Sequence, residues 1–431
     1  MMNDRDDRCR YAGLDRVHAP GLSVGESAMR LRRLAYVEMR LMRLFASRVV
    51  TIADREVKLL MGRLQYEACM HADGLRARVL EMRVAKGRLD VVPDEALAVF
   101  FDEAEHLPNA PAFLAVVTHL IKPALRQAYQ AYLREANHLA DYPSVRLIKQ
   151  CLADEIEHPT LLESVLNRTP FTDADRELAE AWQHSLMRYL SAAGGLDGTA
   201  PRSELPPRKA SQVPYRIPHE LTRDDSFARV WDFVKPPYEH VADHLNYMMS
   251  IRLSEINVAE GLAIVLFETQ DMPWSFYADI SRHCWDEVRH SMFGEAAIEA
   301  TYGDRAALPM RDYEGVFAME APPLEQYAVL GLEVEGKNMK YPPGKRLEWE
   351  FCRDAARHEL MTTFQDFDWA DEVLHVNIAR RQLDHWFEGG LEHIAPFSAA
   401  GREHRTAVKQ RHAPVPVIPS SSSQSKEFTE P

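Results

Sequence analysis

The sequence has few cysteines, little glycine and no long apolar run, and each shortage excludes a class of protein. Its five cysteines form no CxxC and no other close pair, so we expect free thiols and no disulfide framework: Cys9, Cys69, Cys151, Cys284 and Cys352. No uncharged apolar run approaches the roughly 18 residues that cross a bilayer. The charged start MMNDRDDRCR lacks the apolar core of a secretory signal. We therefore expect a soluble, cytoplasmic protein without a membrane partner.

Positive charge is also scarce, because 51 Lys and Arg residues face 65 Asp and Glu residues and leave a formal net charge of −14. An acidic surface repels phosphates, so nucleic acid is not an expected partner. The length of 431 residues is enough for two or three domains, each with its own core.

Strand patterns are missing too, since no stretch alternates apolar and polar residues between hairpin turns. Glycine is sparse, at 19 residues, whereas Leu, Ala, Arg, Glu and Met are plentiful, and this balance favours helices. Apolar residues recur at helical spacing over 27–48, 54–86, 111–138, 143–168, 236–269, 274–301, 322–340 and 346–387. A further helix is expected after Thr172, which suits an N-cap. The predicted fold class is all-α.

A stretch rich in Gly, Pro and polar residues, GGLDGTAPRSELPPRKASQVPYRIP, separates two helical halves and indicates a linker. The halves share an order of helices, and we interpret them as tandem bundles that arose by duplication. The low-complexity end APVPVIPSSSSQSKEFTEP predicts disorder. We expect a tail, a helical domain, a linker, a second helical domain and a disordered tail at residues 1–25, 26–192, 193–223, 224–395 and 396–431, respectively.

One pentad, Asp-Glu-(Val/Ile)-x-His, occurs in three near-copies: DEIEH at 154–158, DEVRH at 286–290 and DEVLH at 371–375. At ordinary residue frequencies, a pattern this constrained is expected far less than once in such a chain. On an α-helix, residues three apart lie on one face, about 5–6 Å apart at Cβ. Glu287 with His290, and Glu372 with His375, can therefore each reach a single point inside a bundle.

Two such ExxH helices, with one Glu from each of two more helices, form the di-iron or di-manganese site of four-helix bundles. The carboxylates supply negative charge and bridging oxygens, and the imidazoles supply neutral nitrogen. SEINVAEGL offers Glu255 or Glu260 as one of the two additional carboxylates, and LGLEVEGK offers Glu333 or Glu335 as the other.

An aspartate precedes each of the two ligand glutamates. Asp286 and Asp371 point about 100° round the helix from these glutamates. There, each carboxylate could accept the ring N–H of the ligand histidine on the neighbouring helix and so fix its orientation.

The order E…ExxH…E…ExxH across residues 255–375 resembles the ferritin-like di-iron carboxylate superfamily. Within it, SEINVAEGL, WDEVRHSMF, VEGKNMKYPP and DEVLHV are most similar to an uncharacterised bacterial family related to tRNA-modifying hydroxylases. The resemblance covers roughly residues 240–390 and implies a ferritin-like four-helix bundle with two metal ions. The family's first ligand carboxylate lies about thirty residues before the ExxH glutamate. Its third ligand carboxylate is a glutamate followed by a small residue and then a basic one. The ligands that the resemblance implies are Glu255, Glu287, His290, Glu335, Glu372 and His375, with Glu260 and Glu333 as alternatives.

The resemblance also bears on His283, which lies four residues before Glu287 and on the same helix stripe. Arylamine N-oxygenating members of the superfamily carry an extra histidine ligand at this place. The other interpretation, which we prefer, is a histidine that contacts a ligand residue without binding metal itself, or a hydrogen-bonded core histidine.

The N-terminal half keeps only part of the ligand pattern. The segment that would face DEIEH reads QYEACMH, with methionine where ExxH needs histidine, although a histidine follows at the next position. We expect a degenerate bundle that serves packing or dimerisation, with a working metal site as the alternative. The weak site candidates of this half are Glu38, Glu67, His71, Glu155 and His158.

The leading functional hypothesis is a di-iron oxidase or oxygenase that uses O₂ on a small organic substrate. Hydroxylation, N-oxygenation and desaturation share one ligand set and all stay open. The expected cofactor is two iron ions, with manganese or a mixed Mn/Fe pair as alternatives. An electron donor protein and a homodimer are compatible with this hypothesis. The rival functions are a ferroxidase or peroxide-scavenging bundle, a tRNA hydroxylase, which the net charge of −14 opposes, and a non-catalytic scaffold.

Overall fold

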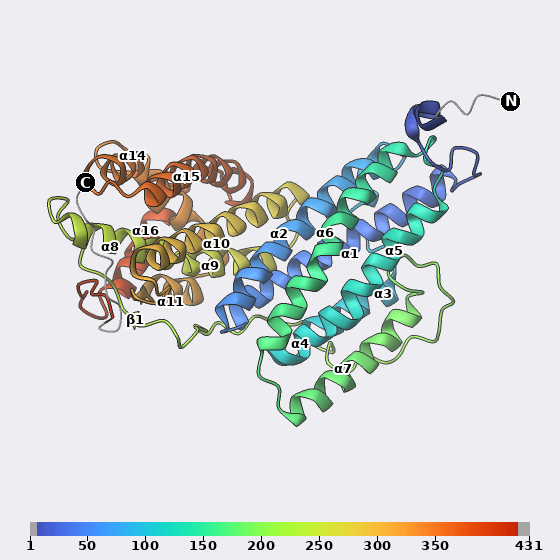
Figure 1. Cartoon of the computed structure of the whole chain (residues 1–431), viewed down its shortest axis with the longest axis horizontal. Coiled ribbons are helices and arrows are strands. Elements are labelled where there is room, and N and C mark those ends of the chain that lie inside the picture. The colour runs from blue at the N-terminus through green and yellow to red at the C-terminus, as the bar shows by residue number, and fades with distance from the viewer. Residues whose placement is uncertain (1–6, 421–431) are drawn as a thin grey trace. The chain divides into compact units, whose positions relative to one another are not determined.

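The structure, a computed structural model, describes residues 7–420 and is almost entirely helical, which confirms the all-α prediction (Figure 1). The chain divides into two compact units. The N-terminal unit comprises Met1–Leu44 and Glu67–Arg216, and the C-terminal unit comprises Phe45–Tyr66 and Ile217–Pro431. The expected domain at 26–192 is therefore interrupted, because the end of its first helix and the start of its second belong to the C-terminal unit.

The helices that begin in the first half of the chain are η1 (Asp7–Gly13), α1 (Val24–Thr51), α2 (Arg55–Leu80), η2 (Lys86–Arg88), α3 (Glu95–Glu105), α4 (Ala110–Val116), η3 (Val117–Ile121), α5 (Lys122–Glu135), α6 (Tyr142–Arg168) and α7 (Asp173–Ala192). In the N-terminal unit α1, α2, α5 and α6 run alongside one another (Figure 1). Thr172 caps α7 in a capping box with Asp175, as its sequence position predicts.

The helices of the second half are α8 (Val241–Leu253), α9 (Ile256–Glu268), α10 (Trp274–Tyr302), α11 (Tyr313–Glu320), α12 (Pro323–Ala328), η4 (Val329–Glu335), α13 (Gly336–Asn338), α14 (Lys345–Glu350), η5 (Phe351–Ala355), α15 (Glu359–Trp386) and α16 (Ala395–Lys409). Two short strands, β1 (Arg229–Val230) and β2 (Met310–Arg311), pair in parallel.

Several expected helices are interrupted. The predicted helix at 236–269 is two helices, because Ser254 and Glu255 separate α8 from α9. The Ser254 hydroxyl donates to the Ser250 carbonyl and accepts from the backbone N–H of Arg311, so this side chain engages backbone groups at the break. The predicted helix at 346–387 ends and restarts around Arg357, whose φ is 51°. The elements η3 and η4 are π-helical turns inside longer helices.

Two glycines allow close approach between elements of the C-terminal unit. A Cβ on Gly294 would lie 2.1 Å from the backbone nitrogen of Leu253, so α10 and α8 meet backbone to backbone. A Cβ on Gly331 would lie 2.2 Å from the Cβ of Ala379, so η4 lies directly on α15. Larger side chains at either position would push these elements apart.

Residues 193–228, all of them described, contain no helix or strand, in keeping with a linker. Part of this segment is held on the N-terminal unit by Glu103. Its carboxylate accepts the backbone N–H groups of Lys209, Ala210 and Ser211 at 2.7, 2.9 and 3.1 Å. The linker is therefore anchored in the unit to which these residues belong.

The expected disordered tail at 396–431 begins too early. Ala395–Lys409 forms the helix α16, whose Val408 is fully buried beside Phe317. Further along, the backbone N–H of Val234 donates to the carbonyl of Val415 at 2.9 Å. Val417 is also buried in the core of the C-terminal unit, and low complexity alone did not indicate this. Residues 421–431 lie outside the described part of the chain.

Candidate metal centre

Acidic and imidazole side chains converge inside the C-terminal unit from four helical segments. They come from the α8–α9 junction, α10, the end of η4 and α15, and they are all buried: Glu255, Glu287, His290, Glu335, Glu372 and His375. These are the six residues that the sequence predicts as ligands, and the fold brings them together. The close approaches at Gly294 and Gly331 join the same segments.

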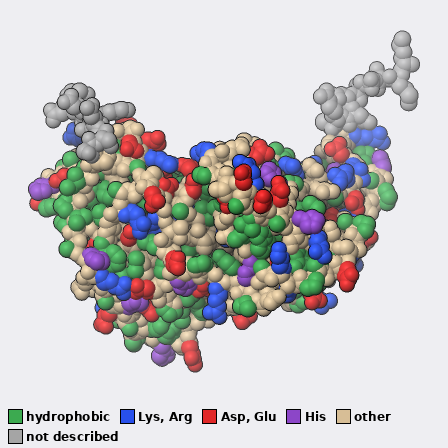
Figure 2. Space-filling model, turned by 90° about the horizontal axis from the view of Figure 1, so that it is seen from below, with side chains coloured by type: hydrophobic (Ala, Val, Ile, Leu, Met, Phe, Trp, Pro, Cys, Tyr) green, Lys and Arg blue, Asp and Glu red, His purple; other side chains and the backbone are tan. Residues whose placement is uncertain are grey.

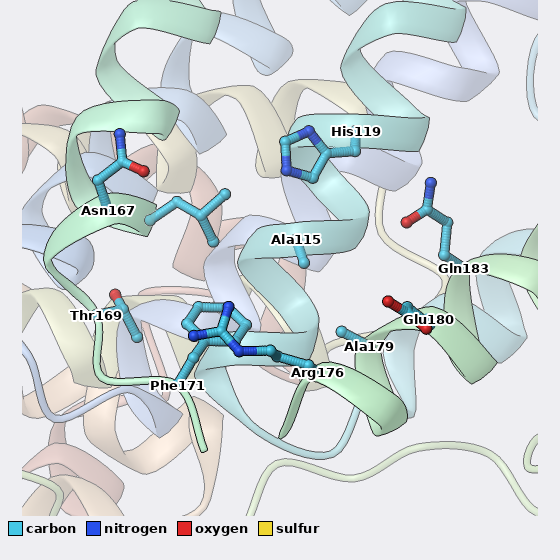
Figure 3. A pocket seen from close by; sticks show the side chains of 10 residues that line it. Ala115, His119, Asn167, Thr169, Phe171, Arg176, Ala179, Glu180 and Gln183 are labelled. Atoms are coloured by element: carbon cyan, nitrogen blue, oxygen red, sulfur yellow. The ribbon is translucent and has the colours of Figure 1, made fainter. Parts of the chain in front are cut away.

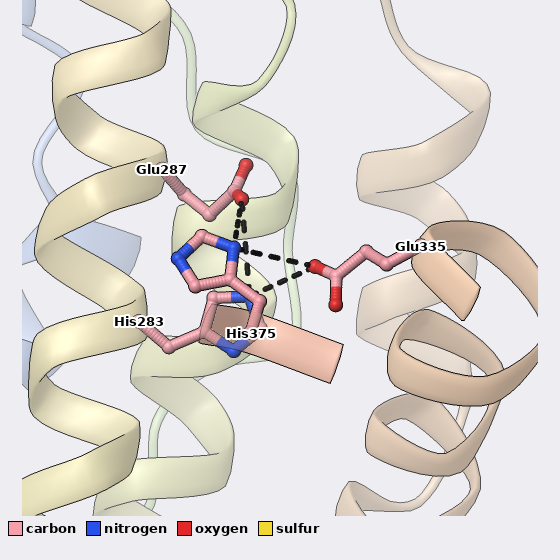
Figure 4. A group of neighbouring side chains, drawn as sticks. All are labelled: His283, Glu287, Glu335 and His375. Atoms are coloured by element: carbon pink, nitrogen blue, oxygen red, sulfur yellow. Dashed lines mark hydrogen bonds and ion pairs between the residues drawn. The ribbon is translucent and has the colours of Figure 1, made fainter. Parts of the chain in front are cut away.

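The ligand atoms fall into overlapping groups. One atom from each of His283, Glu287, Glu335 and His375 lies within 4.8 Å of the others (Figure 4). Two further groups of the same kind are Glu255 with Glu287 and His290, and His290 with Asp368 and Glu372. Because Glu287 and His290 each belong to two groups, the arrangement suits two neighbouring cations that share ligands.

The two pentad histidines are oriented by aspartates of the opposite pentad. The Nε2 of His290 lies 3.2 Å from Asp371 Oδ2, and the Nε2 of His375 lies 3.3 Å from Asp286 Oδ2. These are the contacts expected for Asp286 and Asp371. With the proton on Nε2, each Nδ1 keeps a free lone pair, and His375 Nδ1 faces Glu287 Oε1 at 3.5 Å and Glu335 Oε1 at 3.7 Å (Figure 4).

Arginines hold these two aspartates in turn. The Nε of Arg282 donates to Asp286 Oδ2 at 2.7 Å, and Arg289 lies 2.5 Å from Asp286 Oδ1 and 3.2 Å from Asp371 Oδ2. Burial acts to raise the pKa of Asp286, but hydrogen bonds from His375 and Arg282 outweigh it and lower that pKa. Asp286 is therefore ionised and ready to accept the imidazole N–H.

Several atoms at the centre of the cluster are buried and have no hydrogen-bond partner among the described residues. They are Glu255 Oε2, His290 Nδ1, Glu335 Oε2, Glu372 Oε2 and His375 Nδ1. A buried polar atom without a partner is unfavourable, and such atoms are rare in native proteins. Oxygen and imidazole nitrogen are the donors that iron and manganese take, so this donor set fits a pair of such ions.

Burial also opposes ionisation of the carboxyls. It is the leading cause that raises the pKa of Glu255, Glu335 and Glu372, with charge from neighbouring carboxylates in addition. Positive charge at the centre would reverse this preference and favour the carboxylate forms. The protein therefore holds together acids that are best accommodated around cations.

Three buried residues at the centre were not predicted from the sequence. Asp368, one turn before Glu372 on α15, joins the ligand group of His290 and Glu372. The guanidinium of Arg252 contacts Asp368 and lies 2.7 Å from Glu255 Oε1. Lys345 Nζ lies 2.9 Å from Asp368 Oδ2 and 2.7 Å from Glu372 Oε1. The four-residue spacing from Asp368 to Glu372 places both on one helix face and could have predicted Asp368. Arg252 and Lys345 reach the site only through the tertiary fold.

His283 lies in the cluster, where its position is compatible both with a histidine hydrogen-bonded to a ligand residue, the preferred sequence interpretation, and with an extra ligand. Its Nε2 lies 2.9 Å from Glu335 Oε1, and its ring stacks on the ring of His375 at 3.7 Å between centroids. Figure 4 shows the side chains of His283 and His375 facing the carboxylates of Glu287 and Glu335. In either role, His283 belongs to the same centre.

The two alternative carboxylates lie elsewhere. Glu260 is fully buried and pairs with Lys58 and with Arg223, whose Nη1 lies 2.5 and 2.7 Å from its oxygens. Glu333 pairs with Lys337 at 2.6 Å and accepts from Ser398 at 3.1 Å. Neither joins a ligand group, so the structure selects Glu255 and Glu335 instead.

The weak candidates of the N-terminal unit also lie together, but in a different chemical arrangement. Glu38, His71 and Glu155 form a group of ligand-type atoms. His158 Nε2 lies 2.6 Å from Glu67 Oε2. A lysine that the sequence did not suggest, Lys122, contacts Glu155 and His158 inside this cluster.

A surface hollow in the N-terminal unit is lined by residues that belong to neither cluster (Figure 3). Its volume is about 550 Å³, and it is lined by polar and exposed side chains that include His119, Asn167 and Arg176. Its lining contains no group of acids and histidines comparable to the buried clusters. We therefore place the candidate site at the buried C-terminal cluster.

On the face drawn in Figure 2, acidic and basic side chains are interspersed among the coloured residues. Among the residues that the structure describes, no helix is both long and apolar enough to cross a membrane. Comparison of the chain with protein-family models, with curated proteins and with solved structures finds no match. The chemistry of the buried cluster is therefore the basis for proposing a function.

Proposed function

We propose that the C-terminal unit is a ferritin-like four-helix bundle that binds two iron ions and uses O₂ to oxidise a small organic substrate. The N-terminal unit is, in this proposal, a second and degenerate bundle of the same kind. Manganese, alone or paired with iron, is the alternative metal. The observation that carries the proposal is the set of buried, partnerless Glu and His atoms that face one another from four helical segments.

The ligands would divide between two neighbouring positions. Glu255, Glu287 and His290 would serve one, with Asp368 and Glu372 beside it. His283, Glu335 and His375 would serve the other together with the shared Glu287. Two iron ions held in this way would supply the electrons that reduce O₂ and the oxidising power for the substrate.

The remaining residues of the site orient the ligands and exclude water. Asp371 and Asp286 keep the proton of each imidazole on Nε2, so that Nδ1 points into the centre. The core around the ligands is apolar and fully buried at Val288, Ile378 and Ala379, which keeps solvent from the reacting groups.

A small cavity lies near the cluster. It has a volume of about 60 Å³, lies between α9, α11, α12, η4 and α16, and has a mostly apolar lining that includes Val258, Leu262 and Leu330. Tyr327 also lines it, and the Tyr327 ring lies 5.9 Å from the ring of His283, edge to face. The Tyr327 hydroxyl is buried and has no hydrogen-bond partner among the described residues.

The test begins with metal content. Full-length protein from iron-supplemented cells should contain about two iron ions per chain by elemental analysis. The reduced protein should then react with O₂, and oxidation of added ferrous iron should stop after about two ions per chain, as in a carboxylate-bridged pair. Sustained oxidation of many more ions per chain would instead establish a ferroxidase. Folded protein without bound metal would refute the proposal.

A further inference from the structure

The cluster of the N-terminal unit resembles the C-terminal cluster in outline. In order along the chain, a glutamate on α1 or just after the end of α8 is followed by a glutamate on the next long helix of the cluster, Glu38 and Glu67 against Glu255 and Glu287. Each ends with the DExxH pentad on its last long helix. The histidine of this last pentad directs Nε2 at a carboxylate of the second helix, since His375 faces Asp286 at 3.3 Å and His158 faces Glu67 at 2.6 Å.

The third ligand position differs in charge. In the C-terminal unit, a π-helical turn, η4, ends at Glu335. In the N-terminal unit the corresponding π-helical turn, η3, is followed immediately by Lys122. The side chain of Lys122 is 2% exposed, and its Nζ lies 2.5 Å from Glu155 Oε1 and 3.0 Å from His158 Nδ1. A cation-bearing side chain therefore stands where the other unit has a carboxylate.

The Lys122 ammonium uses the atoms that a metal ion would need. His158 Nδ1 corresponds to His375 Nδ1, which has no hydrogen-bond partner, whereas His158 Nδ1 accepts from Lys122. Glu155 Oε1 is likewise taken by Lys122. Because a fixed ammonium and a metal ion cannot occupy one point, Lys122 excludes the ion that its neighbours would otherwise hold.

A buried histidine that lies between two carboxylates belongs to the same cluster. The Nδ1 of His71 lies 3.1 Å from Glu38 Oε1, and its Nε2 lies 2.9 Å from Asp154 Oδ2. Burial acts to lower the pKa of His71, but the carboxylates of Glu38 and Asp154 outweigh it and raise that pKa to about 10. Both ring nitrogens of His71 therefore face carboxylates, whereas Nδ1 of His375 has no hydrogen-bond partner among the described residues. The hydroxyl of Tyr129 also donates to Glu38.

We infer that the N-terminal unit is a metal-free copy of the C-terminal site, in which the ammonium of Lys122 takes the place of a metal ion. This inference rests on the proposed metal centre for comparison. The N-terminal cluster rejects iron, manganese and similar divalent ions while the unit stays folded. It also identifies Lys122 as the residue that closes the site.

The experiment uses the full chain with the C-terminal centre disabled by Glu287→Ala and His375→Ala. In this background we expect almost no bound iron, cobalt or manganese after loading and desalting. Adding Lys122→Glu should raise the content by about one ion per chain, because it restores the carboxylate of the bundle site. Lys149→Glu, an equal charge change at an exposed position of α6, is the matched control and should add none. A folded Lys122→Glu variant that binds no more metal than this control would overturn the inference.

A second measurement needs no variant at position 122. In ¹⁵N-histidine NMR spectra of the wild-type chain, added zinc should shift the ring signals of the C-terminal ligands and leave those of His71 and His158 unchanged. Shifts at His71 or His158 would overturn the inference even if Lys122→Glu fails to fold. If the proposed function is wrong, the result differs, because added zinc would then shift the ring signals of no histidine in either unit.

Discussion

Glu255 and Glu260 are close in sequence, and the structure gives their carboxylates opposite surroundings. Glu255 lies in the ligand cluster, with one oxygen 2.7 Å from Arg252 and the other without a hydrogen-bond partner. Glu260 is fully buried and neutralises Lys58 and Arg223. Replacing each by alanine should therefore affect different properties: metal binding for Glu255 and folding stability for Glu260.

The expected sizes follow from these surroundings. Glu260→Ala leaves two buried cations without their acid, and breaking a buried ion pair in this way costs about 3–5 kcal/mol of unfolding free energy. Glu255→Ala removes an acid whose burial raises its pKa, and Arg252 keeps Asp368 as a partner, so the metal-free protein should lose little stability. Loss of one ligand should weaken metal binding by at least about tenfold, or ~1.4 kcal/mol.

The assay is denaturant unfolding of metal-free protein combined with metal titration of each variant. Chelator-treated Glu260→Ala should unfold at clearly lower denaturant than wild type, yet bind the wild-type number of ions below its unfolding transition. Chelator-treated Glu255→Ala should unfold close to wild type but gain little stability when metal is added. If Glu260→Ala loses metal and Glu255→Ala keeps it, the placement of the first carboxylate is wrong.

Three further predictions use the same methods. His290→Ala should remove most bound metal with helicity intact, whereas His158→Ala should leave the metal content unchanged; equal losses would show that both units bind metal. Asp371→Ala should weaken metal affinity by about 10–100-fold through loss of imidazole orientation, which metal-competition titration measures, and unchanged affinity would exclude that role. The pKa of Glu155 is lowered from 4.5 to about 2 because Lys122 and His158 outweigh the effect of burial. Its contribution to stability is therefore present above pH 4.5 and lost as the pH falls toward 2, which acid unfolding with and without Glu155→Gln should reveal as a smaller pH dependence in the variant.

Features with a local cause could be predicted from the sequence. The pairs Glu287 with His290 and Glu372 with His375 share a helix face because of the helical period, and the same reasoning placed Asp286 and Asp371 toward the opposite helix. The choice of Glu255 over Glu260 required family spacing, because both lie on one helical stretch of sequence. The break at Ser254 and Glu255 was not predicted, since apolar periodicity continues through it.

Features that arise from tertiary convergence could not be predicted. Lys345 reaches Asp368 and Glu372 from the start of a separate short helix, and no spacing along the chain relates them. Lys122 follows a π-helical turn, where the period of 3.6 residues no longer assigns side chains to a face. The assignment of Phe45–Tyr66 to the C-terminal unit depends likewise on packing partners that are distant in sequence.

The two units bury similar acids and imidazoles but neutralise them in different ways, and this contrast is an argument about function. In the N-terminal cluster, Lys122 contacts Glu155 and His71 contacts Glu38, so groups of the chain itself take up one oxygen of each acid. In the C-terminal cluster, Arg252 and Lys345 supply two positive charges, whereas the buried carboxylates are more numerous: Glu255, Glu287, Glu335, Asp368 and Glu372. Among the described residues, Nδ1 of His290 and Nδ1 of His375 in this second cluster also have no hydrogen-bond partner. A fold retains an unbalanced buried site when something outside the chain completes it, and divalent metal ions match both the missing charge and the free donor atoms.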